Sequence, residues 1–476
     1  MHLKSENFTA NAEAAVADTA LQKRLRVLNT FTQRRAAAFA ELPDGDALRD
    51  RARQIKAHTI NHLDQYLVQL EENVERLGGH VHWARGGDEA CRIILDIARR
   101  NQVRRVVKSK SMATEEIHLN AALERVGIEA VETDLGEYIV QLADEPPSHI
   151  LAPAIHKSKA DIAALFNEKL NAANLREAEE IAAVARVRLR ERFRSAEMGV
   201  TGANFAVAET GTIVLLENEG NIRLSTSLPR LHVAVVGIEK LIPRLADLSV
   251  FLKILARSAT GQTMSSYVSF ITGTRRAGEM DGADEFHLVL LDNGRTRILA
   301  DEAKRESLYC LRCGACLNVC PVYQKIGGHA YGSVYPGPIG SIITPSLAGL
   351  EKSKDLPFAS SLCGACREVC PVRINIPRVL LSLRGDWSEG KGESGEPRSR
   401  PSRIERMVIK AWAFAMKHPR LYNWSFRLPA KLQGPLLKDG RFQRLPLAAS
   451  NWTRNRDFPA IAPKPFRAMW REMNKR

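Results

Sequence analysis

The stretch CLRCGACLNVCP, residues 310–321, is the most informative part of this chain. Its four cysteines follow the spacing Cys-x2-Cys-x2-Cys-x3-Cys-Pro, which is typical of bacterial ferredoxins. The spacing has a chemical reason, because a cubane iron–sulfur cluster needs thiolates that converge on a compact core from several directions. Two-residue gaps let the first three cysteines wrap one cluster, and the cysteine beside proline points away to a second cluster. The stretch therefore predicts a ferredoxin-type region.

A second copy of the motif follows further along the chain. LRCGACLNVCPVY at 311–323 aligns with SLCGACREVCPVR at 361–373, so each cysteine has a partner 50 residues later, except that Ser360 stands opposite Cys310. Cross-ligation between the copies predicts two 4Fe-4S clusters, one held by Cys310, Cys313, Cys316 and Cys370 and the other by Cys320, Cys363 and Cys366. The candidates for the fourth ligand of the second cluster are Ser360, Ser361, a distant residue, water and a partner's ligand. A 3Fe-4S cluster is the alternative, and we expect the second cluster to be the more labile.

Other chemistry for these cysteines fits less well. Seven of the eight cysteines lie between 310 and 370, and the N-terminus has no apolar segment of the signal-peptide kind, so disulfides are not expected. Zinc sites usually separate paired cysteines by longer gaps. The 42 residues between Cys320 and Cys363 favour a helical ferredoxin domain over a small β-rich one. His329 in this stretch is interpreted as a packing residue rather than a ligand.

The residues before the cysteines predict two further regions. Residues 1–80 show apolar residues at helical spacing and are predicted to form a helical segment packed on the next domain. Residues 81–300 alternate strand and helix signals, which predicts an α/β domain with a mainly parallel sheet. Strands are expected at 103–107 and 127–134, in a pair joined by a turn near 209–212, in 231–242, where the strand runs into a helix, and at 287–291.

The cysteine region is predicted to span residues 301–385. A linker and a basic extension follow it. Residues 386–402 have the composition of a linker, and 403–476 form a basic extension. From 398 to 476 there are 19 Lys and Arg against 4 Asp and Glu, so the first 397 residues are close to neutral. Because these first 397 residues carry almost no net charge, the sequence argues against a nucleic-acid-binding protein.

Within this extension, 403–418 predicts an amphipathic helix. Its apolar face consists of Ile404, Met407, Val408, Ala411, Trp412 and Ala415. Docking within a complex is the favoured interpretation, and contact with an anionic membrane is the alternative. No apolar run of about 18 residues is present, so we expect a cytoplasmic protein, with the inner face of the membrane as a site of peripheral contact.

The chain resembles the lactate utilization protein B family. The resemblance is carried by TGANFAVAETGTIVLLENEGNIRLSTSLPRLHV at 201–233, followed by the two cysteine motifs, and it covers nearly the whole chain. It implies that the α/β domain is a LUD domain, with a fold similar to the sugar-phosphate isomerase and CoA-transferase type. It also implies electron transport in the oxidation of L-lactate to pyruvate with two companion proteins, and that all seven motif cysteines are cluster ligands. The resemblance does not identify the final electron acceptor, for which a quinone is one candidate.

A catalytic role for the α/β domain is the alternative to pure electron transfer. In α/β folds, ligands usually bind at the carboxyl ends of the strands. Polar residues follow several predicted strands here: Lys108, Ser109 and Lys110, then Glu132 and Asp134, and Glu209 with Thr210 in the turn. A carboxylate beside cationic groups could bind and deprotonate a hydroxy acid, and Lys108, Lys110, Glu209 and Thr210 are the candidate substrate-binding residues. Ordinary loop polarity is the simpler interpretation. No Rossmann or P-loop glycine motif is present.

Overall fold

The computed structural model describes residues 4–390, 403–445, 450, 452–453 and 456–474. The chain forms two compact units, one reaching to Trp387 and a second that contains the C-terminal residues, and each is described separately. No helix among the described residues combines the length and the apolarity needed to cross a bilayer.

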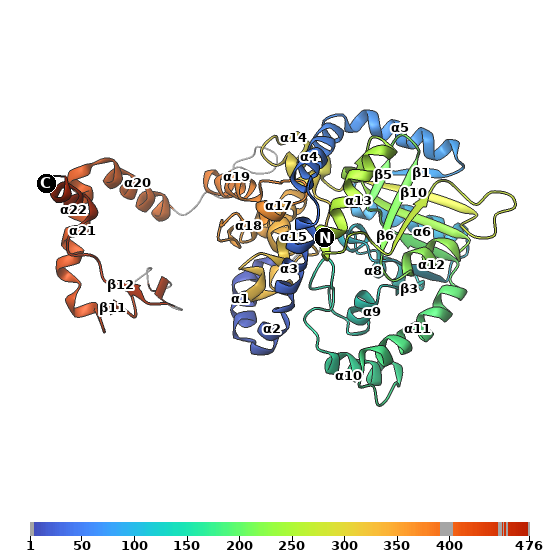
Figure 1. The fold of residues 1–476 in the computed structure, drawn as a ribbon, viewed down its shortest axis with the longest axis horizontal. Helices are drawn as coiled ribbons and strands as arrows, with labels where there is room; N and C mark the ends of the chain where they lie inside the picture. Colours follow the sequence, from blue (N-terminus) through green and yellow to red (C-terminus); the bar gives the residue numbers. More distant parts are fainter. Residues whose placement is uncertain (1–3, 391–402, 446–449, 451, 454–455, 475–476) are drawn as a thin grey trace. The chain divides into compact units, whose positions relative to one another are not determined.

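A six-stranded parallel sheet lies at the centre of the α/β region (Figure 1). Its strands, in spatial order, are β1 (His80–Ala84), β10 (Glu285–Leu291), β7 (Leu231–Gly237), β4 (Met198–Thr201), β2 (Arg105–Lys108) and β3 (Glu129–Glu132). The register places Val107 of β2 between Val131 of β3 and Gly199 of β4. The chain therefore moves from β2 outward to β3, but from β4 through β7 to β10 in the opposite direction, so the order reverses between β2 and β4.

The middle of this sheet is buried on both faces, which explains why every residue of the central strand β7 is buried. Val233 and Val235 of β7 pack on one face with α6 (Gly87–Arg100) and α8 (Leu119–Glu124). Ala234 and Val236 pack on the other with α5 (Leu63–Arg76). The expected α/β domain with a parallel sheet is thus confirmed.

A second, four-stranded sheet packs on the same face of the parallel sheet as α5. Its order is β8 (Leu241–Ile242), β5 (Phe205–Val207), β6 (Thr212–Glu217) and β9 (Tyr267–Ile271). β5 and β6 are antiparallel, and the turn between them contains Gly211 at a φ of 66°, as the sequence predicts. The helix expected directly after β7 is absent: a 3-10 turn (Ile238–Lys240) and β8 follow instead, because the chain leaves the first sheet and pairs with β5.

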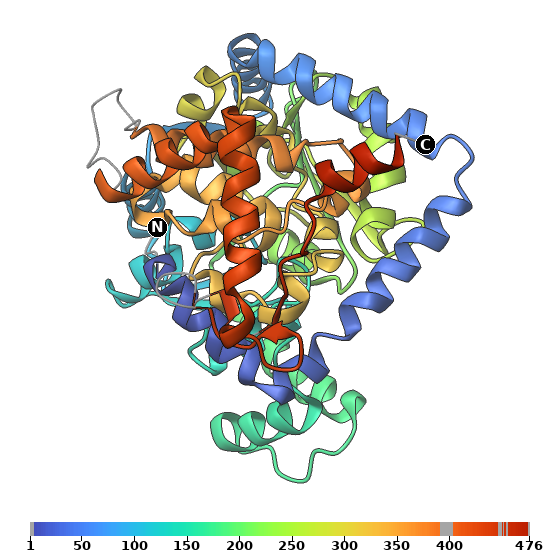
Figure 2. The same ribbon diagram turned by 90° about the vertical axis from the view of Figure 1, so that its left-hand side faces the viewer.

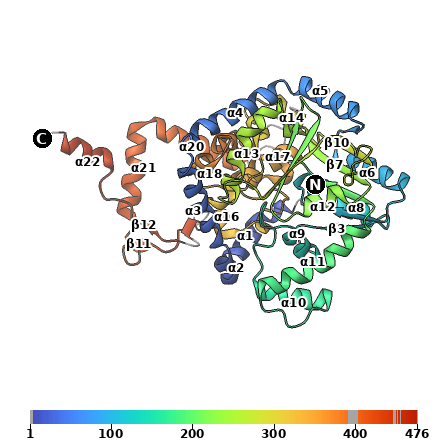
Figure 3. The same ribbon diagram turned by 45° about the vertical axis from the view of Figure 1, so that its right-hand side comes forward.

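The remaining helices of the α/β region connect and flank these sheets. They are α7 (Met112–Glu116), α9 (Leu135–Leu142), α10 (Lys159–Leu170), α11 (Ala178–Ser195), α12 (Asn221–Ser227), α13 (Leu245–Ala259) and α14 (Arg295–Ala300). α10 and α11 pack against each other at one end of this unit (Figure 3).

The cysteine region, residues 301–390, contains helices and loops and no strand. Its helices are α15 (Ala315–Asn318), α16 (Tyr323–Ile326), α17 (Gly337–Ala348), α18 (Ala365–Val369) and α19 (Ile376–Glu389). One apolar core joins this region to α13 and to the N-terminal helices. The predicted linker from 386 is helical up to Glu389, and 391–402 lie outside the described residues.

The N-terminal segment covers more than the α/β domain. It contains α1 (Phe8–Ala17), α2 (Thr19–Arg24), α3 (Val27–Ala40), α4 (Gly45–Asn61) and α5. α5 packs on the α/β sheet as expected, but α1 contacts α16 and α3 contacts α15. The expectation that the whole segment packs on the α/β domain is therefore corrected. An amphipathic pattern specifies which face of a helix is buried and does not specify the partner.

The C-terminal unit is mainly helical. α20 (Arg403–Lys417) and α21 (Pro419–Leu432) meet at an angle (Figure 2). Two short strands, β11 (Arg441–Phe442) and β12 (Phe458–Pro459), pair antiparallel, and α22 (Phe466–Met473) follows. The predicted helix at 403–418 is present almost over its full length.

Candidate iron–sulfur centre and the adjoining cavity

The two cysteine loops have the same local backbone. Each contains a residue with a left-handed φ, 61° at Arg312 and 56° at Leu362, and then a glycine with positive φ, Gly314 or Gly364. A short helix follows each glycine, α15 in the first loop and α18 in the second. The sequence repeat is therefore a structural repeat, and glycine is favoured at 314 and 364 because it adopts a positive φ without steric cost.

The four cysteines assigned to the first cluster line one cavity. Cys310, Cys313, Cys316 and Cys370 enclose it together with apolar residues such as Ile339, Val372 and Ile376. Burial raises the pKa of Cys313 to about 12, and Cys310 and Cys370 increase the shift. Four soft sulfur donors in an apolar cavity fit an iron–sulfur cluster. Because burial raises the pKa of Cys313, cluster binding must release the proton of this thiol.

The other three cysteines form a second group. Burial, and then the neighbouring Cys320 and Cys363, raises the pKa of Cys366 to about 12. Cys363 also raises the pKa of Cys320, after burial as the main cause. Cys363 is solvent-exposed, whereas Cys320 and Cys366 are buried. The cross-ligation, in which Cys320 and Cys370 each leave their own loop and join the other, stays a prediction. The pKa of Cys316 is also raised by Cys366, after burial as the main cause, so the two groups lie near each other.

Backbone groups and arginines stabilise the sulfur positions. The N–H groups of Arg312 and Ile374 donate to Cys310 Sγ and Cys370 Sγ, both at 3.3 Å. Such N–H···S bonds help to set cluster potentials. Arg49 of α4, whose side chain is 9% exposed, donates from Nη2 to the carbonyl oxygen of Cys370 at 3.0 Å. The N-terminal helices thus support the cluster site directly.

A buried ion-pair network joins the α/β region to the first cysteine loop. Glu239, which follows β7, accepts from Arg295 Nε at 2.5 Å and from Arg312 at 3.2 Å. Burial alone would raise the pKa of Glu239, but the two guanidinium groups outweigh it and hold the pKa at about 2. Arg295 also pairs with Glu116 of α7 at 2.9 Å, and Tyr335 of the cysteine region donates to Glu116 at 2.6 Å.

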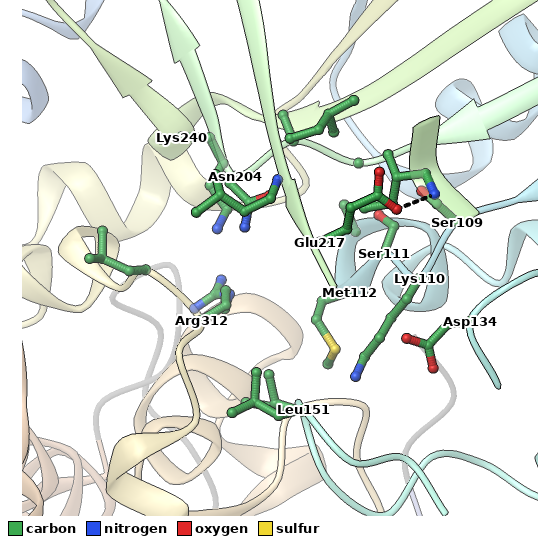
Figure 4. A pocket seen from close by; sticks show the side chains of 18 of the residues that line it. Ser109, Lys110, Ser111, Met112, Asp134, Leu151, Asn204, Glu217, Lys240 and Arg312 are labelled. Carbon is green, nitrogen blue, oxygen red and sulfur yellow. Dashed lines mark hydrogen bonds between the residues drawn. The ribbon is translucent and has the colours of Figure 1, made fainter. Parts of the chain in front are cut away.

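A cavity of about 300 Å³ lies at the carboxyl ends of the parallel strands. Its lining includes Lys110 after β2, Asp134 after β3, Asn204 after β4 and Lys240 after β7. Figure 4 shows Lys240, Asn204 and Arg312 on one side of the cavity, and Lys110 with Asp134 on the other. Leu311 and Arg312 line this cavity and also the cysteine-lined one, so the two cavities share a wall.

Only part of the predicted substrate-binding set lies here. Lys110 lines the cavity, with Ser109 and Asp134, which also follow strands. Lys108 does not: it is buried and pairs with Glu115 at 2.8 Å and Glu132 at 2.6 Å. Burial alone would lower the pKa of Lys108, but these two carboxylates outweigh it and raise it.

Glu209 and Thr210 lie apart from the cavity. Glu209 accepts from the backbone N–H of Leu245 at 2.9 Å, and Thr210 donates to Thr212 at 2.8 Å. Neither belongs to the cavity lining, because their turn lies at the start of β6, and the cavity is lined by Leu216 and Glu217 at the other end of that strand. His329, interpreted as a packing residue, hydrogen-bonds the carbonyl oxygen of Pro146 at 2.8 Å.

Sequence reasoning missed most polar residues of the cavity, among them Lys240, Arg312 and Asn204. Lys240 follows a predicted strand and was within reach of the strand-end rule, but a helix was expected there. Arg312 stands between two cysteines, and nothing in the motif indicates that its side chain faces the α/β domain. Asn204 lies after β4, which was not among the predicted strands.

Family models match nearly the whole chain. The LUD domain model matches residues 67–291, the 4Fe-4S dicluster domain model matches 306–374, and the model of the lactate utilisation protein B C-terminal region matches 383–475. The middle match covers both cysteine motifs. It agrees with iron–sulfur clusters as the cofactors.

Curated relatives align over almost their full length. Lactate utilization protein B of Shouchella clausii is 45% identical over 93% of this chain and 91% of the relative. An uncharacterized electron transport protein of Escherichia coli K12, YkgF, is 43% identical over 99% of this chain and 98% of the relative. A solved DUF162 family protein from Deinococcus radiodurans is 15% identical and covers 48% of this chain and 98% of its own, and its TM-score of 0.28 is too low to support an argument about the fold.

Proposed function

Because this chain belongs to the lactate utilization protein B family, we propose that it is an iron–sulfur electron-transfer protein in the oxidation of L-lactate to pyruvate. It acts with companion lactate utilization proteins and passes electrons to an acceptor, for which a quinone is one candidate. The relative named as an electron transport protein supports this role. We also propose that the α/β domain has a fold similar to the sugar-phosphate isomerase and CoA-transferase type.

The observation that carries the proposal is the arrangement of the two cysteine groups. Cys310, Cys313, Cys316 and Cys370 line a buried cavity, whereas Cys363 of the second group is exposed. Electrons can therefore enter at a buried cluster and leave at one near the surface, where a partner can approach. Lactate oxidation releases two electrons, and each bound cluster takes up and releases one, so the pair can hold both transiently.

The chain's own residues hold and tune this centre. The seven cysteines are the proposed ligands, and N–H···S bonds together with Arg49 fix the loops around the first cluster. The second cluster has three cysteines and an exposed edge, which makes it the more labile of the two and leaves the 3Fe-4S form open. This lability is part of the proposal.

Anaerobic reduction tests the function. The full chain, prepared without oxygen, should contain iron and inorganic sulfide and give cluster signals in EPR. Lactate should bleach the cluster absorbance when companion proteins are present and leave it unchanged when they are absent. Colourless protein that contains zinc would contradict the proposal, as would clusters that stay oxidised with lactate and all partners present.

One observation favours a second candidate, a catalytic subunit whose LUD domain itself binds and oxidises the hydroxy acid. The strand-end cavity shares Leu311 and Arg312 with the cluster cavity, so a substrate bound there would lie beside the first cluster. Bleaching by lactate with the isolated chain supports this candidate. Bleaching that requires partners supports electron transfer alone.

A further inference from the structure

The strand-end cavity lies where the parallel sheet changes direction. The strand order reverses between β2 and β4, and the cavity is lined by residues that directly follow both strands, including Lys110 and Asn204. In open α/β sheets, ligands bind at such a point, outside the carboxyl ends of the strands. Its volume of about 300 Å³ is at the lower end of the range for ligand sites, which favours a small molecule.

The cavity presents hydrogen-bond donors that the protein does not use. Among the residues that the structure describes, the side chains of Lys110 and Lys240 form no hydrogen bond or ion pair. Arg312 donates to Glu239 from Nη2, but its Nη1 is buried and has no partner. The side-chain oxygen of Asn204 accepts from the N–H of Leu216 at 2.8 Å, which orients the amide and leaves its NH2 group free to donate. Buried donors are rarely left unpaired.

The acidic side chains of the cavity, in contrast, are already used as acceptors. Glu217 accepts from the backbone N–H groups of Ile222 at 2.6 Å and Arg223 at 2.8 Å. Glu219 accepts from the N–H of Leu135 at 3.1 Å. Burial, and then a nearby aspartate, raises the pKa of Glu219 to about 7, so part of the negative charge is neutralised near neutral pH. Unused donors beside satisfied acceptors indicate an acceptor-rich, anionic ligand.

We propose that this cavity binds the carboxylate of a small organic acid through Arg312, Lys240 and Asn204. Guanidinium and ammonium groups bind carboxylates through charge-assisted hydrogen bonds. Leu151, Leu216 and Leu311 supply apolar wall for a short carbon chain. The narrower class, a 2-hydroxy or 2-oxo acid, rests on the proposed function.

The position of Arg312 also links this site to the first cluster. Its guanidinium lines the carboxylate site and lies 4.5 Å from the ring centre of Tyr335, while its backbone N–H donates to Cys310 Sγ. A ligand that binds the side chain therefore changes the charge next to the first cluster. Binding should alter the EPR signal assigned to that cluster and leave the other signal unchanged.

Calorimetry on the full, anaerobically prepared chain tests the site. L-lactate and pyruvate should release or absorb heat with saturation, whereas lactamide, which lacks the carboxylate charge, should not. Lys240→Met should weaken carboxylate binding about tenfold or more, because a charged donor is lost. Lys253→Met, which removes an exposed lysine of α13, is the matched control and should bind as the unmodified chain does.

A second variant guards against an effect on folding. Asn204→Asp keeps the acceptor for Leu216 but replaces the donor with negative charge, so it should abolish carboxylate binding while iron content and cluster absorbance stay unchanged. Full iron content and reducible clusters with no heat from either acid would overturn this inference and leave the electron-transfer proposal intact. Equal binding by the Lys240→Met and Lys253→Met variants would also overturn it. Protein without iron and sulfide would instead contradict the proposed function.

Discussion

At the residue scale, Ser360 is placed like a ligand. In the first loop the N–H of Arg312 donates to Cys310 Sγ at 3.3 Å, and in the second the N–H of Leu362 donates to Ser360 Oγ at 3.1 Å. The two donors share a left-handed backbone, at 61° and 56°. Ser360 Oγ therefore occupies the position in its loop that a cluster-ligand sulfur is proposed to occupy in the other.

Ser360→Cys should strengthen the second cluster. A thiolate at this position completes a four-cysteine set, so more iron should remain bound after a timed exposure to air than in the unmodified chain. Iron and sulfide assays with EPR measure this. Ser249→Cys is the control, because Ser249 is an exposed residue of α13 that lies outside both cysteine loops. Equal iron retention in the Ser360→Cys variant and the unmodified chain would contradict the prediction.

At the scale of elements, the ion pairs around Glu239 connect three parts of the first unit. They join the turn after β7 to α14 through Arg295 and to the first cysteine loop through Arg312. The side chain of Glu239 is 2% exposed, so removing its charge leaves two arginines inadequately paired in a buried site. Because the pKa of Glu239 lies below its usual value, its contribution to stability is present at neutral pH and is lost as the pH falls toward 2.

Glu239→Gln should lower the free energy of unfolding by about 3–5 kcal/mol, the usual cost of removing one partner of a buried ion pair. Urea unfolding at neutral pH, followed by circular dichroism, measures this change. Asp96→Asn is the control, because its pair with Arg99 is exposed at the surface and such pairs are worth about 0–1 kcal/mol. A loss no larger than that of the control would show that the network is not important for stability.

At the scale of the whole molecule, the basic extension presents apolar side chains at its surface. On α20, Met407, Trp412 and Phe414 are 69%, 62% and 58% exposed. Basic groups beside exposed aromatic residues are typical of a surface that meets an acidic partner or an anionic membrane. Docking within the proposed lactate-oxidising complex remains the favoured interpretation.

Removal of residues 398–476 should therefore abolish co-elution with the companion proteins in size-exclusion chromatography, while the seven motif cysteines and their clusters are retained. Trp412→Ala should weaken co-elution, because aromatic anchors dominate interfaces, and Val16→Ala, at a similarly exposed residue of α1, should not. Unchanged co-elution of the truncated chain, with loss of sedimentation on anionic liposomes, would favour the membrane instead.

The sequence by itself determined the features that depend on short spacing. The cysteine gaps and the glycine after Cys313 fix how each loop turns, because a few backbone angles decide where the sulfurs point. Four of the six strands of the parallel sheet, β2, β3, β7 and β10, and the turn at Gly211 were likewise predictable from local pattern, whereas β1 and β4 were not predicted. Lys110 was identified as a site residue because the carboxyl end of a strand is a local feature.

Only the tertiary structure decided which distant residues share the cavity. Glu209 and Thr210 follow a strand as Lys110 does, but their turn leads into the start of β6, whereas the cavity lies at the other end of that strand. Arg312 and Lys240 meet because the cysteine region packs against the carboxyl ends of the parallel strands. Their proximity depends on how separate apolar faces pair. Periodicity reveals that such a face is buried and carries no information about the surface that covers it.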